Sequence, residues 1–299
     1  MSDADGDRVA AVLEALRLPP LPDPLPVPTI DSHTHAEFTL EHSGLTVADS
    51  IAAAALVNVT GFVEIGCDVP SSRDAVALAS GHDRIVAAVA LHPNDAARMV
   101  RKGLGDLDEM IAGIDALAGS GDHVRAVGET GLDFFRTRDE AGQVVQRTSF
   151  EAHIDIAKRH DLTLVIHDRD AHAAILGVLD AVGAPERVIM HCFSGDADFA
   201  RECASRGFWL SFPGVVTFGS AGSLRDALLA TPLDRLLVET DAPYLTPAPV
   251  RGRPNAPYLL PHTVRFVASR LEVDLAELCD RLRRNTEDAY NGPWGASHA

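Results

Sequence analysis

The sequence of 299 residues lacks several features that would assign it to a familiar class of protein. Its four cysteines, Cys67, Cys192, Cys203 and Cys279, lie far apart without a C-x-x-C pair, which argues against a disulfide framework or a cysteine zinc site. No run of eighteen apolar residues occurs, so no spanning helix and no membrane association are expected. The acidic start lacks the basic segment of a secretory signal. These absences predict a cytoplasmic chain with reduced thiols.

Lysine is also scarce, and the balance of charge is strongly negative. Lys102 and Lys158 are the only lysines, and 26 basic residues face 43 acidic ones, so the formal net charge is −17. Such a surface argues against broad binding of nucleic acid through phosphate contacts alone. A phosphate substrate stays possible, because bound divalent cations supply positive charge locally. Neither lysine falls at the end of a predicted strand, which argues against a carbamylated lysine that bridges two metals.

What the chain does contain is a short extension followed by a large domain. Residues 7–18 place apolar side chains at helical spacing, which predicts a short amphipathic helix. The stretch PPLPDPLPVP at 19–28 stops this helix and is typical of a stiff, extended linker. We therefore predict an N-terminal extension over residues 1–28 and one main domain over residues 29–292.

From Thr29 onward, short β-branched runs alternate with segments of helical character. The eight candidate strands lie at Ile30 and at residues 57–65, 85–91, 124–127, 162–166, 188–190, 208–212 and 236–238. Eight such units in one domain predict an α/β fold, the closed (β/α)₈ TIM barrel. An open doubly wound sheet is the alternative, and it is disfavoured because no G-x-G-x-x-G follows the first strand.

Side chains that bind metals recur at the ends of these predicted strands. The first strand ends in DSHTH, whose His33 and His35 lie two residues apart and so face the same side. The others are Glu129 after the fourth strand, His167 at the end of the fifth, His191 after the sixth and Asp241 after the eighth. An isolated histidine at a strand end is more often structural. Because the carboxyl ends of barrel strands meet at one mouth, six such residues at equivalent positions predict a metal site.

Six imidazole and carboxylate ligands suit two divalent ions about 3.5–4 Å apart. The predicted partition gives the two histidines of the first strand and Asp241 to one ion, and His167 and His191 to the other. Glu129 is expected to lie between the two ions. The ligand types fit Mg²⁺, Mn²⁺ or Zn²⁺ and do not choose among them.

Three nearby residues have simpler interpretations. Cys192, next to the ligand histidine, is expected to point to the opposite side of its strand and to pack in the core. Glu239 either orients a histidine or lies deeper in the barrel beside an arginine. His153 falls in a helical segment and is expected at the surface.

Nine stretches, taken together and in order, resemble the TatD family of metal-dependent hydrolases, which are TIM-barrel deoxyribonucleases. They run from about Thr29 to Tyr290 and read DSHTH, LHPND, AVGETGLDF, LVIHDRDA, MHCFSG, LSFPGVVTF, ETDAPYLTP, RGRPNAP and NTEDAY. The resemblance implies the barrel fold, dependence on divalent metals and hydrolysis of phosphodiesters.

The resemblance also assigns roles to residues. The histidines of DSHTH match the ligands of the first metal, Glu129 the shared carboxylate, and the histidines of LVIHDRDA and MHCFSG the ligands of the second. Asp241 matches an aspartate that binds metal and handles the proton of the nucleophile, so Asp241 and Glu129 are the predicted catalytic residues. His92 in LHPND matches a histidine near the substrate. Arg169 and Arg251 match arginines that hold phosphate.

Two departures from the family pattern lie near the predicted site. Asp168 stands in HDRDA where the family commonly has a small hydroxyl residue, which adds negative charge beside a phosphate site. Phe134 and Phe135 replace the aromatic hydroxyl that often follows GLD. Arg169 therefore has an alternative role, a salt bridge with Asp168 or Asp170. The proline-rich extension also has no counterpart in the family pattern.

The sequence thus predicts a two-metal hydrolase that cleaves phosphodiester bonds of DNA, acting on single strands or short ends as an exonuclease, with no obligatory protein partner. The alternative is a metal-dependent amide, ester or lactone hydrolase, because fold does not fix substrate. The arginines at the mouth distinguish the two, since a carbonyl substrate does not need them. An inactive scaffold is disfavoured because all six ligands are present.

Overall fold

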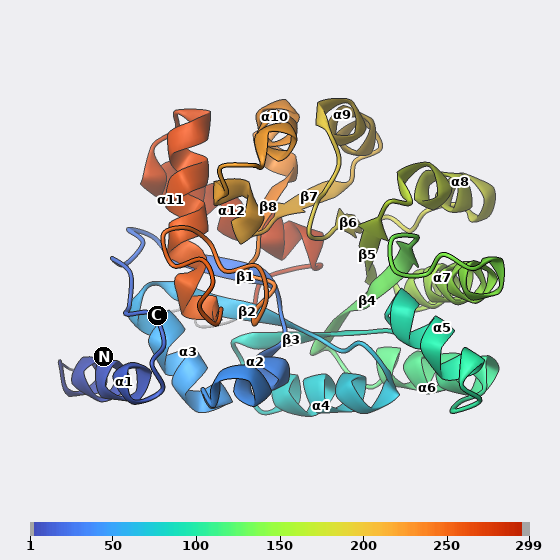
Figure 1. The fold of residues 1–299 in the computed structure, drawn as a ribbon, viewed down its shortest axis with the longest axis horizontal. Coiled ribbons are helices and arrows are strands. Elements are labelled where there is room, and N and C mark those ends of the chain that lie inside the picture. Colours follow the sequence, from blue (N-terminus) through green and yellow to red (C-terminus); the bar gives the residue numbers. More distant parts are fainter. Residues whose placement is uncertain (1–2, 295–299) are drawn as a thin grey trace.

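The structure, a computed structural model, describes residues 3–294 of the chain. Eight parallel strands form one sheet in the order β1 to β8, and helices alternate with them around the outside (Figure 1). The strands are β1 (Thr29–Thr34), β2 (Val59–Ile65), β3 (Ile85–Val89), β4 (Val124–Asp133), β5 (Thr163–Arg169), β6 (Val188–Met190), β7 (Trp209–Phe212) and β8 (Leu236–Val238). The predicted (β/α)₈ barrel is confirmed.

The barrel is nearly closed where the last strand meets the first. The chain just after β8 forms a parallel bridge from Ala242 to Thr34. On either side of the bridge, the Asp241 N–H donates to the His33 carbonyl at 3.0 Å and the His35 N–H donates to the Ala242 carbonyl at 2.9 Å. The closure therefore falls on the segments that carry three of the predicted ligands.

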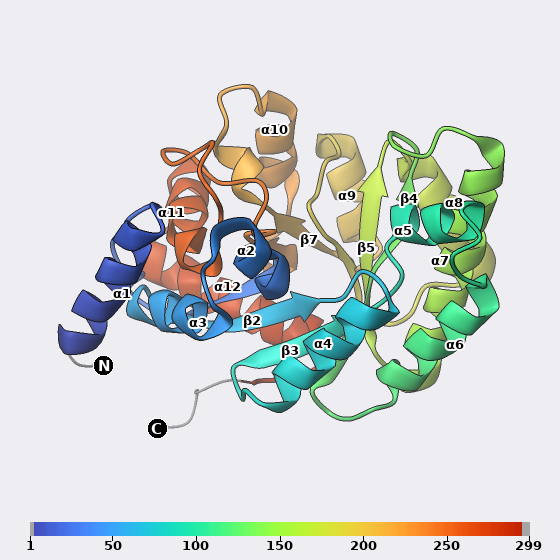
Figure 2. The ribbon, with the colours of Figure 1, turned by 60° about the horizontal axis from the view of Figure 1, so that its bottom comes forward.

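Helices cover the strand ring on its outer side (Figure 2). They are α1 (Asp3–Ala15), α2 (Ala36–Ser43), α3 (Val47–Leu56), α4 (Val69–Ser80), α5 (Pro93–Arg101), α6 (Leu107–Ala118), α7 (Glu140–His160), α8 (His172–Val182), α9 (Ala197–Ser205), α10 (Gly222–Ala230), α11 (Leu260–Leu271) and α12 (Leu275–Ala289), with 3-10 turns η1 (Gly214–Thr217), η2 (Leu233–Arg235) and η3 (Pro257–Leu259). None of these helices, within residues 3–294, is both long and apolar enough to span a bilayer.

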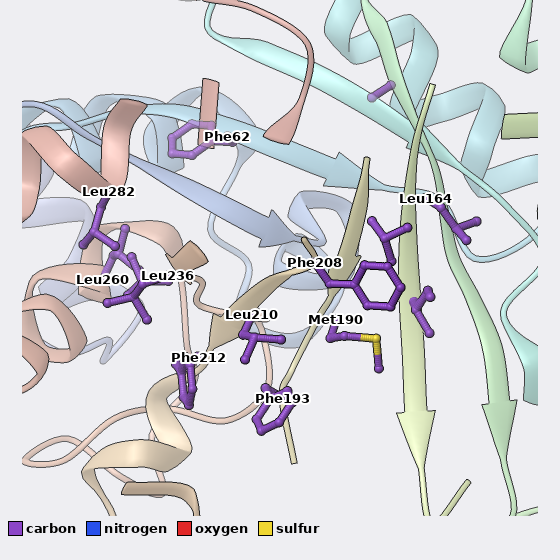
Figure 3. Close-up of a cluster of buried hydrophobic side chains, with 14 of the residues drawn as sticks. Phe62, Leu164, Met190, Phe193, Phe208, Leu210, Phe212, Leu236, Leu260 and Leu282 are labelled. Atoms are coloured by element: carbon purple, nitrogen blue, oxygen red, sulfur yellow. The ribbon is translucent and has the colours of Figure 1, made fainter. Parts of the chain in front are cut away.

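The strands are buried on both faces, as their mostly apolar sequences require. Alternate residues pack outward against the helices; in Figure 3, Leu236 of β8 lies beside Leu260 of α11 and Leu282 of α12. The intervening residues, such as Val165, form a second cluster inside the barrel. This alternation fixes which strand residues face the barrel interior.

The amino ends of the strands, which we call the floor of the barrel, are closed by the segment after α12. Tyr290 is 0% exposed and packs in the inner cluster, with Trp294 against its ring. The Tyr290 hydroxyl donates to the carbonyl of Ser32 at 2.8 Å. Thr163, the first residue of β5, donates its hydroxyl to the Ala289 carbonyl at 2.6 Å. The floor is thus packed and hydrogen-bonded.

The N-terminal extension packs along the barrel wall. Its helix spans Asp3–Ala15 rather than residues 7–18, because the chain turns at Arg17, which has a left-handed φ of 56° ahead of the prolines. Leu13 and Leu25 are buried in the same core cluster as the outer strand residues. The buried Tyr258 hydroxyl donates to the Pro19 carbonyl at 2.7 Å, and the Leu25 N–H to the Val57 carbonyl at 3.1 Å. The division at residue 28 stays a prediction.

Candidate metal centre

The structure brings all six predicted ligands together at the carboxyl ends of the strands, which we call the mouth. His33 lies in β1 and His35 directly follows it, while His167 lies in β5. His191 and Asp241 follow β6 and β8 within a few residues. Glu129 lies inside β4, which continues to Asp133 instead of ending at residue 127 as predicted.

Two glycines allow β4 to carry Glu129 so close to β5. A Cβ atom at Gly131 would lie 2.2 Å from the His167 carbonyl oxygen, and one at Gly128 would lie 2.4 Å from the Val165 Cβ. Gly131 also has a φ of 139°, which side chains other than glycine's rarely adopt. The glycines of AVGETGLDF therefore belong to a strand, whereas glycines usually indicate a turn.

The two oxygens of the Glu129 carboxylate face different histidines. Oε1 lies 3.7 Å from Nε2 of His33 and 3.5 Å from Nε2 of His35. The same two nitrogens lie 3.7 and 3.5 Å from Oδ1 of Asp241. Two ligand atoms with bonds of about 2.0–2.1 Å to one ion lie about 3–4 Å apart. His33, His35 and Asp241 thus form one group of potential ligands beside Oε1 of Glu129.

The second oxygen of Glu129 faces the other strands. Oε2 lies 2.8 Å from Nε2 of His191 and 3.1 Å from Nδ1 of His167. His92, at the start of α5, also approaches, with its Nε2 3.8 Å from the same oxygen. His92 therefore lies beside the potential ligands Glu129 and His167, and its predicted role near the substrate stays a prediction. Glu129 thus has histidines close to both of its carboxylate oxygens.

The histidines at the centre fit a cation better than any other partner. His33 is 0% exposed, and neither of its ring nitrogens has a hydrogen-bond partner among residues 3–294. Its ring stacks on that of His191, with centroids 3.8 Å apart. Burying unpaired polar atoms is costly, whereas a neutral imidazole is the form that ligates metals. The cluster of imidazoles and carboxylates therefore fits divalent metals.

Burial and neighbouring charges shift the pKa values of the histidines and carboxylates at the mouth. Burial lowers the pKa of His33, and the adjacent His191 lowers it further, so His33 is neutral. Burial likewise lowers the pKa of His92 to about 3. Burial alone opposes ionisation of Glu129, but the surrounding histidines, led by His191, outweigh it and hold the pKa of Glu129 well below its usual range. Burial also acts to lower the pKa of His191, but Glu129 and Glu239 outweigh it and raise that pKa well above its usual range. The centre thus combines the Glu129 carboxylate with imidazoles of both kinds, some with lowered and some with raised pKa values.

A further buried carboxylate contacts the second ring nitrogen of His191. Glu239 is fully buried, and its Oε1 lies 3.3 Å from Nδ1 of His191 and accepts the Cys192 N–H at 2.7 Å. Of the two predicted roles for Glu239, the orienting one agrees with this contact.

Cys192 does not pack in the core as predicted. It is half-buried, and its φ of 44° breaks the alternation because β6 has already ended at Met190. Burial raises the pKa of its thiol well above the usual range, and Asp241 and Glu239 add to that effect. Cys192 is thus held at the mouth through its backbone, which donates to Glu239 at 2.7 Å.

Asp133, which the sequence analysis did not single out, also belongs to the site. Its Oδ2 lies 3.4 Å from Nε2 of His167 and accepts a hydrogen bond from the Asn94 amide at 2.6 Å. Asp133 follows Glu129 by four residues, so both face the same side of β4. That spacing is visible in the sequence once β4 is extended through its glycines.

Asp241 lies where the backbone is held under constraint. Its φ of 51° is uncommon for a residue with a side chain, and such residues concentrate at functional sites. The fully buried Asp31 of β1 accepts hydrogen bonds from the N–H of Thr240 at 2.9 Å and from that of His33 at 3.3 Å. Asp31 thus fixes the junction that places Asp241 beside the first strand.

The two predicted phosphate-binding arginines are exposed and have no carboxylate partner in the described part of the chain. The guanidinium of Arg169 lies over the ring of Phe135 at 4.1 Å, and that of Arg251 lies over Phe218 at 4.0 Å. Asp168 instead accepts a hydrogen bond from Nδ1 of His172 at 2.8 Å. The predicted salt bridge of Arg169 with Asp168 is therefore not formed.

His153 is fully buried, so its predicted place at the surface is wrong. Its Nδ1 lies 2.6 Å from the Ser149 carbonyl, and its Nε2 accepts the Leu91 N–H at 3.0 Å. It lies on the inner face of α7, where it accepts the hydrogen bond of the Leu91 N–H, one residue before His92.

Comparison with known proteins identifies the family. The family model described as "TatD related DNase" matches residues 30–291. The chain belongs to the TatD family. Among its relatives in this family, an uncharacterized metal-dependent hydrolase TatD of Mycobacterium tuberculosis is 41% identical over 270 residues, which cover 89% of this chain and 98% of the relative. A protein of Citrobacter rodentium named 3'-5' ssDNA/RNA exonuclease TatD is 30% identical, over 86% of this chain and 94% of its own.

A solved TatD homologue shares the fold. The crystal structure of YjjV from Escherichia coli K12 matches with a TM-score of 0.79 and 26% identity, over 89% of this chain and 98% of that one. The predicted resemblance to TatD proteins is confirmed, and the chain is a metal-dependent hydrolase of this family. Within residues 3–294, the histidine and carboxylate groups at the mouth are suitable for holding the metal.

Proposed function

We propose that this TatD protein is a deoxyribonuclease that removes nucleotides from the ends of single-stranded DNA with the help of two divalent ions. His33, His35 and Asp241 would hold one ion, and His167 and His191 the other, with Glu129 shared between them. The ions, Mg²⁺, Mn²⁺ or Zn²⁺, would supply an activated water and neutralise charge on the phosphate.

The observation that carries this proposal is the division of the Glu129 carboxylate between two sets of histidines. Oε1 faces Nε2 of His33 and His35 at 3.7 and 3.5 Å, while Oε2 faces His191 and His167 at 2.8 and 3.1 Å. A single-ion site would need the carboxylate on one side only. Two neighbouring sites are the arrangement that phosphodiester hydrolysis by in-line displacement favours.

Asp241 is suited to take the proton of the attacking water. Burial opposes its ionisation, but the hydrogen bond with His35, together with the other histidines nearby, outweighs that effect and lowers the pKa of Asp241, so it is a carboxylate near neutral pH. Proton transfer requires such a group within hydrogen-bond reach of the nucleophile. Asp241 would therefore both bind metal and act as general base.

Arg169 and Arg251 supply the positive charge for the rest of the substrate. Each guanidinium is exposed and lies on a phenylalanine ring rather than on a carboxylate, which keeps its planar donor edge free for phosphate oxygens. His92, which lies close to Glu129, would contact the substrate at that point. The name of the Citrobacter relative, an exonuclease for single-stranded DNA and RNA, agrees with this substrate.

The test is turnover of single-stranded DNA labelled at either end, with Mg²⁺ or Mn²⁺, beside a panel of ester, amide and lactone substrates. We expect stepwise shortening from one end. Asp241→Asn should abolish cleavage because its amide cannot take a proton, and Asp168→Asn serves as a nearby control that keeps activity. Turnover of a carbonyl substrate without cleavage of DNA would instead assign the amidohydrolase alternative.

A further inference from the structure

A thiol lies at the edge of the metal centre and has no part in the function proposed above. Cys67 follows β2 by two residues and is 8% exposed. Its Sγ lies 3.8 Å from Oε1 of Glu129 and 3.9 Å from Nδ1 of His35. Cys67 thus contacts the Glu129 oxygen that faces the first group of ligands.

The backbone holds this thiol in place. The Cys67 N–H donates to the Ser71 hydroxyl at 2.9 Å, and the Cys67 carbonyl accepts the His92 N–H at 2.8 Å. Asp68 caps α4 by accepting the Ser71 N–H at 2.9 Å. Gly66 is packed so closely that a Cβ atom there would lie 2.4 Å from Ser72 Cα. The backbone that carries the thiol is therefore fixed on both sides of Cys67.

The surrounding groups indicate a ligand independently of the cysteine. His33, fully buried and without a hydrogen-bond partner among the described residues, points at the same Glu129 oxygen at 3.7 Å. Nδ1 of His35 is engaged by the Ile65 carbonyl at 3.1 Å, which leaves its Nε2 directed at Glu129 and Asp241. Ligand atoms of His35, Cys67 and Glu129 lie within 4.8 Å of one another.

We propose that Cys67 is an additional ligand of the ion held by His35 and Glu129, and that it gives this position a preference for soft cations such as Zn²⁺ and Cd²⁺ over Mg²⁺ and Mn²⁺. On binding, the S–H bond is replaced by a sulfur–metal bond and the proton is released to solvent. The inference rests on the proposed metal centre but not on the proposed substrate.

The distances and the chemistry agree with this role. A zinc ion bonded to sulfur at about 2.3 Å and to a carboxylate oxygen at about 2.0–2.2 Å holds the two atoms about 3.5–4 Å apart. The observed separation of 3.8 Å falls in that range. Thiolate is a soft ligand that selects Zn²⁺, whereas Mg²⁺ and Mn²⁺ prefer oxygen ligands. Of the other ligands at this position, the carboxylates suit Mg²⁺ and Mn²⁺ and the imidazoles suit Zn²⁺, so a thiolate would shift a mixed site toward Zn²⁺.

The test is titration of the metal-stripped protein with Cd²⁺, followed by the ultraviolet absorption of cadmium–thiolate bonds and by metal content measured with mass spectrometry. Mn²⁺ is titrated in parallel. We expect the band in the natural protein and its loss in Cys67→Ser. Cd²⁺ affinity should fall by at least about 10- to 100-fold, the loss that follows even from removing a group that only supports a ligand, while Mn²⁺ affinity is unchanged.

Two matched variants serve as controls. Cys203→Ser removes a thiol that is fully buried in α9, and Cys192→Ser removes the other thiol at the mouth; both should keep the band. Cys67→Ala and the unfolding temperature without metal separate loss of a ligand from loss of the fold. Bound Cd²⁺ without a thiolate band, or a band that persists in Cys67→Ser, would overturn the proposal. No bound metal at all would overturn the metal centre as well, whereas absence of nuclease activity would affect neither result.

Discussion

The mouth and the floor of this barrel are built from the same eight strands, yet a fully buried side chain at the centre of each, His33 at the mouth and Tyr290 at the floor, differs in hydrogen bonding. At the floor, the hydroxyl of Tyr290 bonds to the Ser32 carbonyl at 2.8 Å, and Thr163 bonds to the Ala289 carbonyl at 2.6 Å. At the mouth, His33 is just as buried, but its ring has no hydrogen-bond partner within residues 3–294.

The difference separates stability from function in space. Paired polar groups and aromatic packing at the floor stabilise the barrel. Unpaired imidazoles at the mouth lower stability unless a cation joins them. Active sites of this fold lie at the carboxyl ends of the strands, and the contrast between the ends gives a physical account of that rule for this chain. Substitutions at the two ends should therefore have separable effects.

The largest expected effect is at the mouth. Glu129→Ala should release both ions and abolish activity, because one carboxylate faces both groups of histidines. His191→Ala should weaken mainly one ion, since its Nε2 lies 2.8 Å from Oε2 of Glu129, the oxygen that also faces His167. Metal content after dialysis, measured by mass spectrometry, tests this difference. Equal loss of a single ion from both variants would argue against a shared Glu129.

The next largest effect is at the floor. Tyr290→Ala should lower the free energy of unfolding by about 3–5 kcal/mol, the usual cost of deleting a buried aromatic ring. Tyr290→Phe should cost only about 1 kcal/mol, the value of one hydrogen bond. Urea unfolding measures both, and metal content of the folded variants should match that of the natural protein. Loss of metal from Tyr290→Phe would show that the two ends are not separable.

A third prediction concerns a buried histidine that has its partners. Burial lowers the pKa of His153 to about 4, whereas in the unfolded chain it is near 6.5. Between these values the unfolded chain binds the proton and the folded chain does not. The free energy of unfolding should therefore fall as the pH drops from 6.5 to 4, by up to about 1.4 kcal/mol per pH unit from this residue.

His153→Gln keeps an acceptor for the Leu91 N–H but does not titrate. Urea unfolding across this pH range, compared between the variant and the natural protein, isolates the contribution of His153 from those of other groups. Parallel curves for the two proteins would contradict the prediction.

The smallest effect is expected at the rim of the mouth. Arg251→Ala should weaken binding of single-stranded DNA by about 1.5–3 kcal/mol, the value of a charged hydrogen bond, with metal content unchanged. With a net charge of −17, the protein should contact only two or three phosphates. The slope of log affinity against log salt should then be only about −1.5 to −2. In the variant, the slope should become shallower by about 0.7, because one phosphate contact is lost.

A matched control lies away from the mouth. Arg270, in the last turn of α11, is an exposed arginine whose guanidinium lies over Phe266 at 5.2 Å. Arg270→Ala should leave both the affinity and the salt slope as they are. Tight binding of DNA in EDTA, or a steep slope, would show that the surface rather than the mouth binds the nucleic acid.

Much of the fold could be predicted because strands buried on both faces have a simple signature. Short β-branched runs such as residues 188–190 are strands in the structure, and their spacing gives the barrel. The extension of β4 to Asp133 could not be predicted, because Gly128 and Gly131 suggest a turn unless the close approach of β5 is known. With β4 cut short, Asp133 was not recognised.

The candidate site shows the same limit. The six predicted ligands lie at strand ends, where regular geometry carries over from the sequence pattern. Cys67 and Cys192 lie just beyond strands, where left-handed turns and loop packing decide which way a side chain points. His153 reads as a surface residue because helical spacing alone does not say how deeply α7 is covered. Tertiary packing, not local pattern, decided these three positions.

The closure of the barrel between β1 and β8 has a consequence for biosynthesis. The first ligands are at residues 33 and 35, while Asp241 and the Thr240 that bonds to Asp31 are separated from them by about two hundred residues. A growing chain cannot join these segments until the last strand has left the ribosome. The nascent protein would therefore be unable to assemble the complete centre during most of its synthesis, so uptake of metal by all six residues is a late step that follows release of nearly the whole chain.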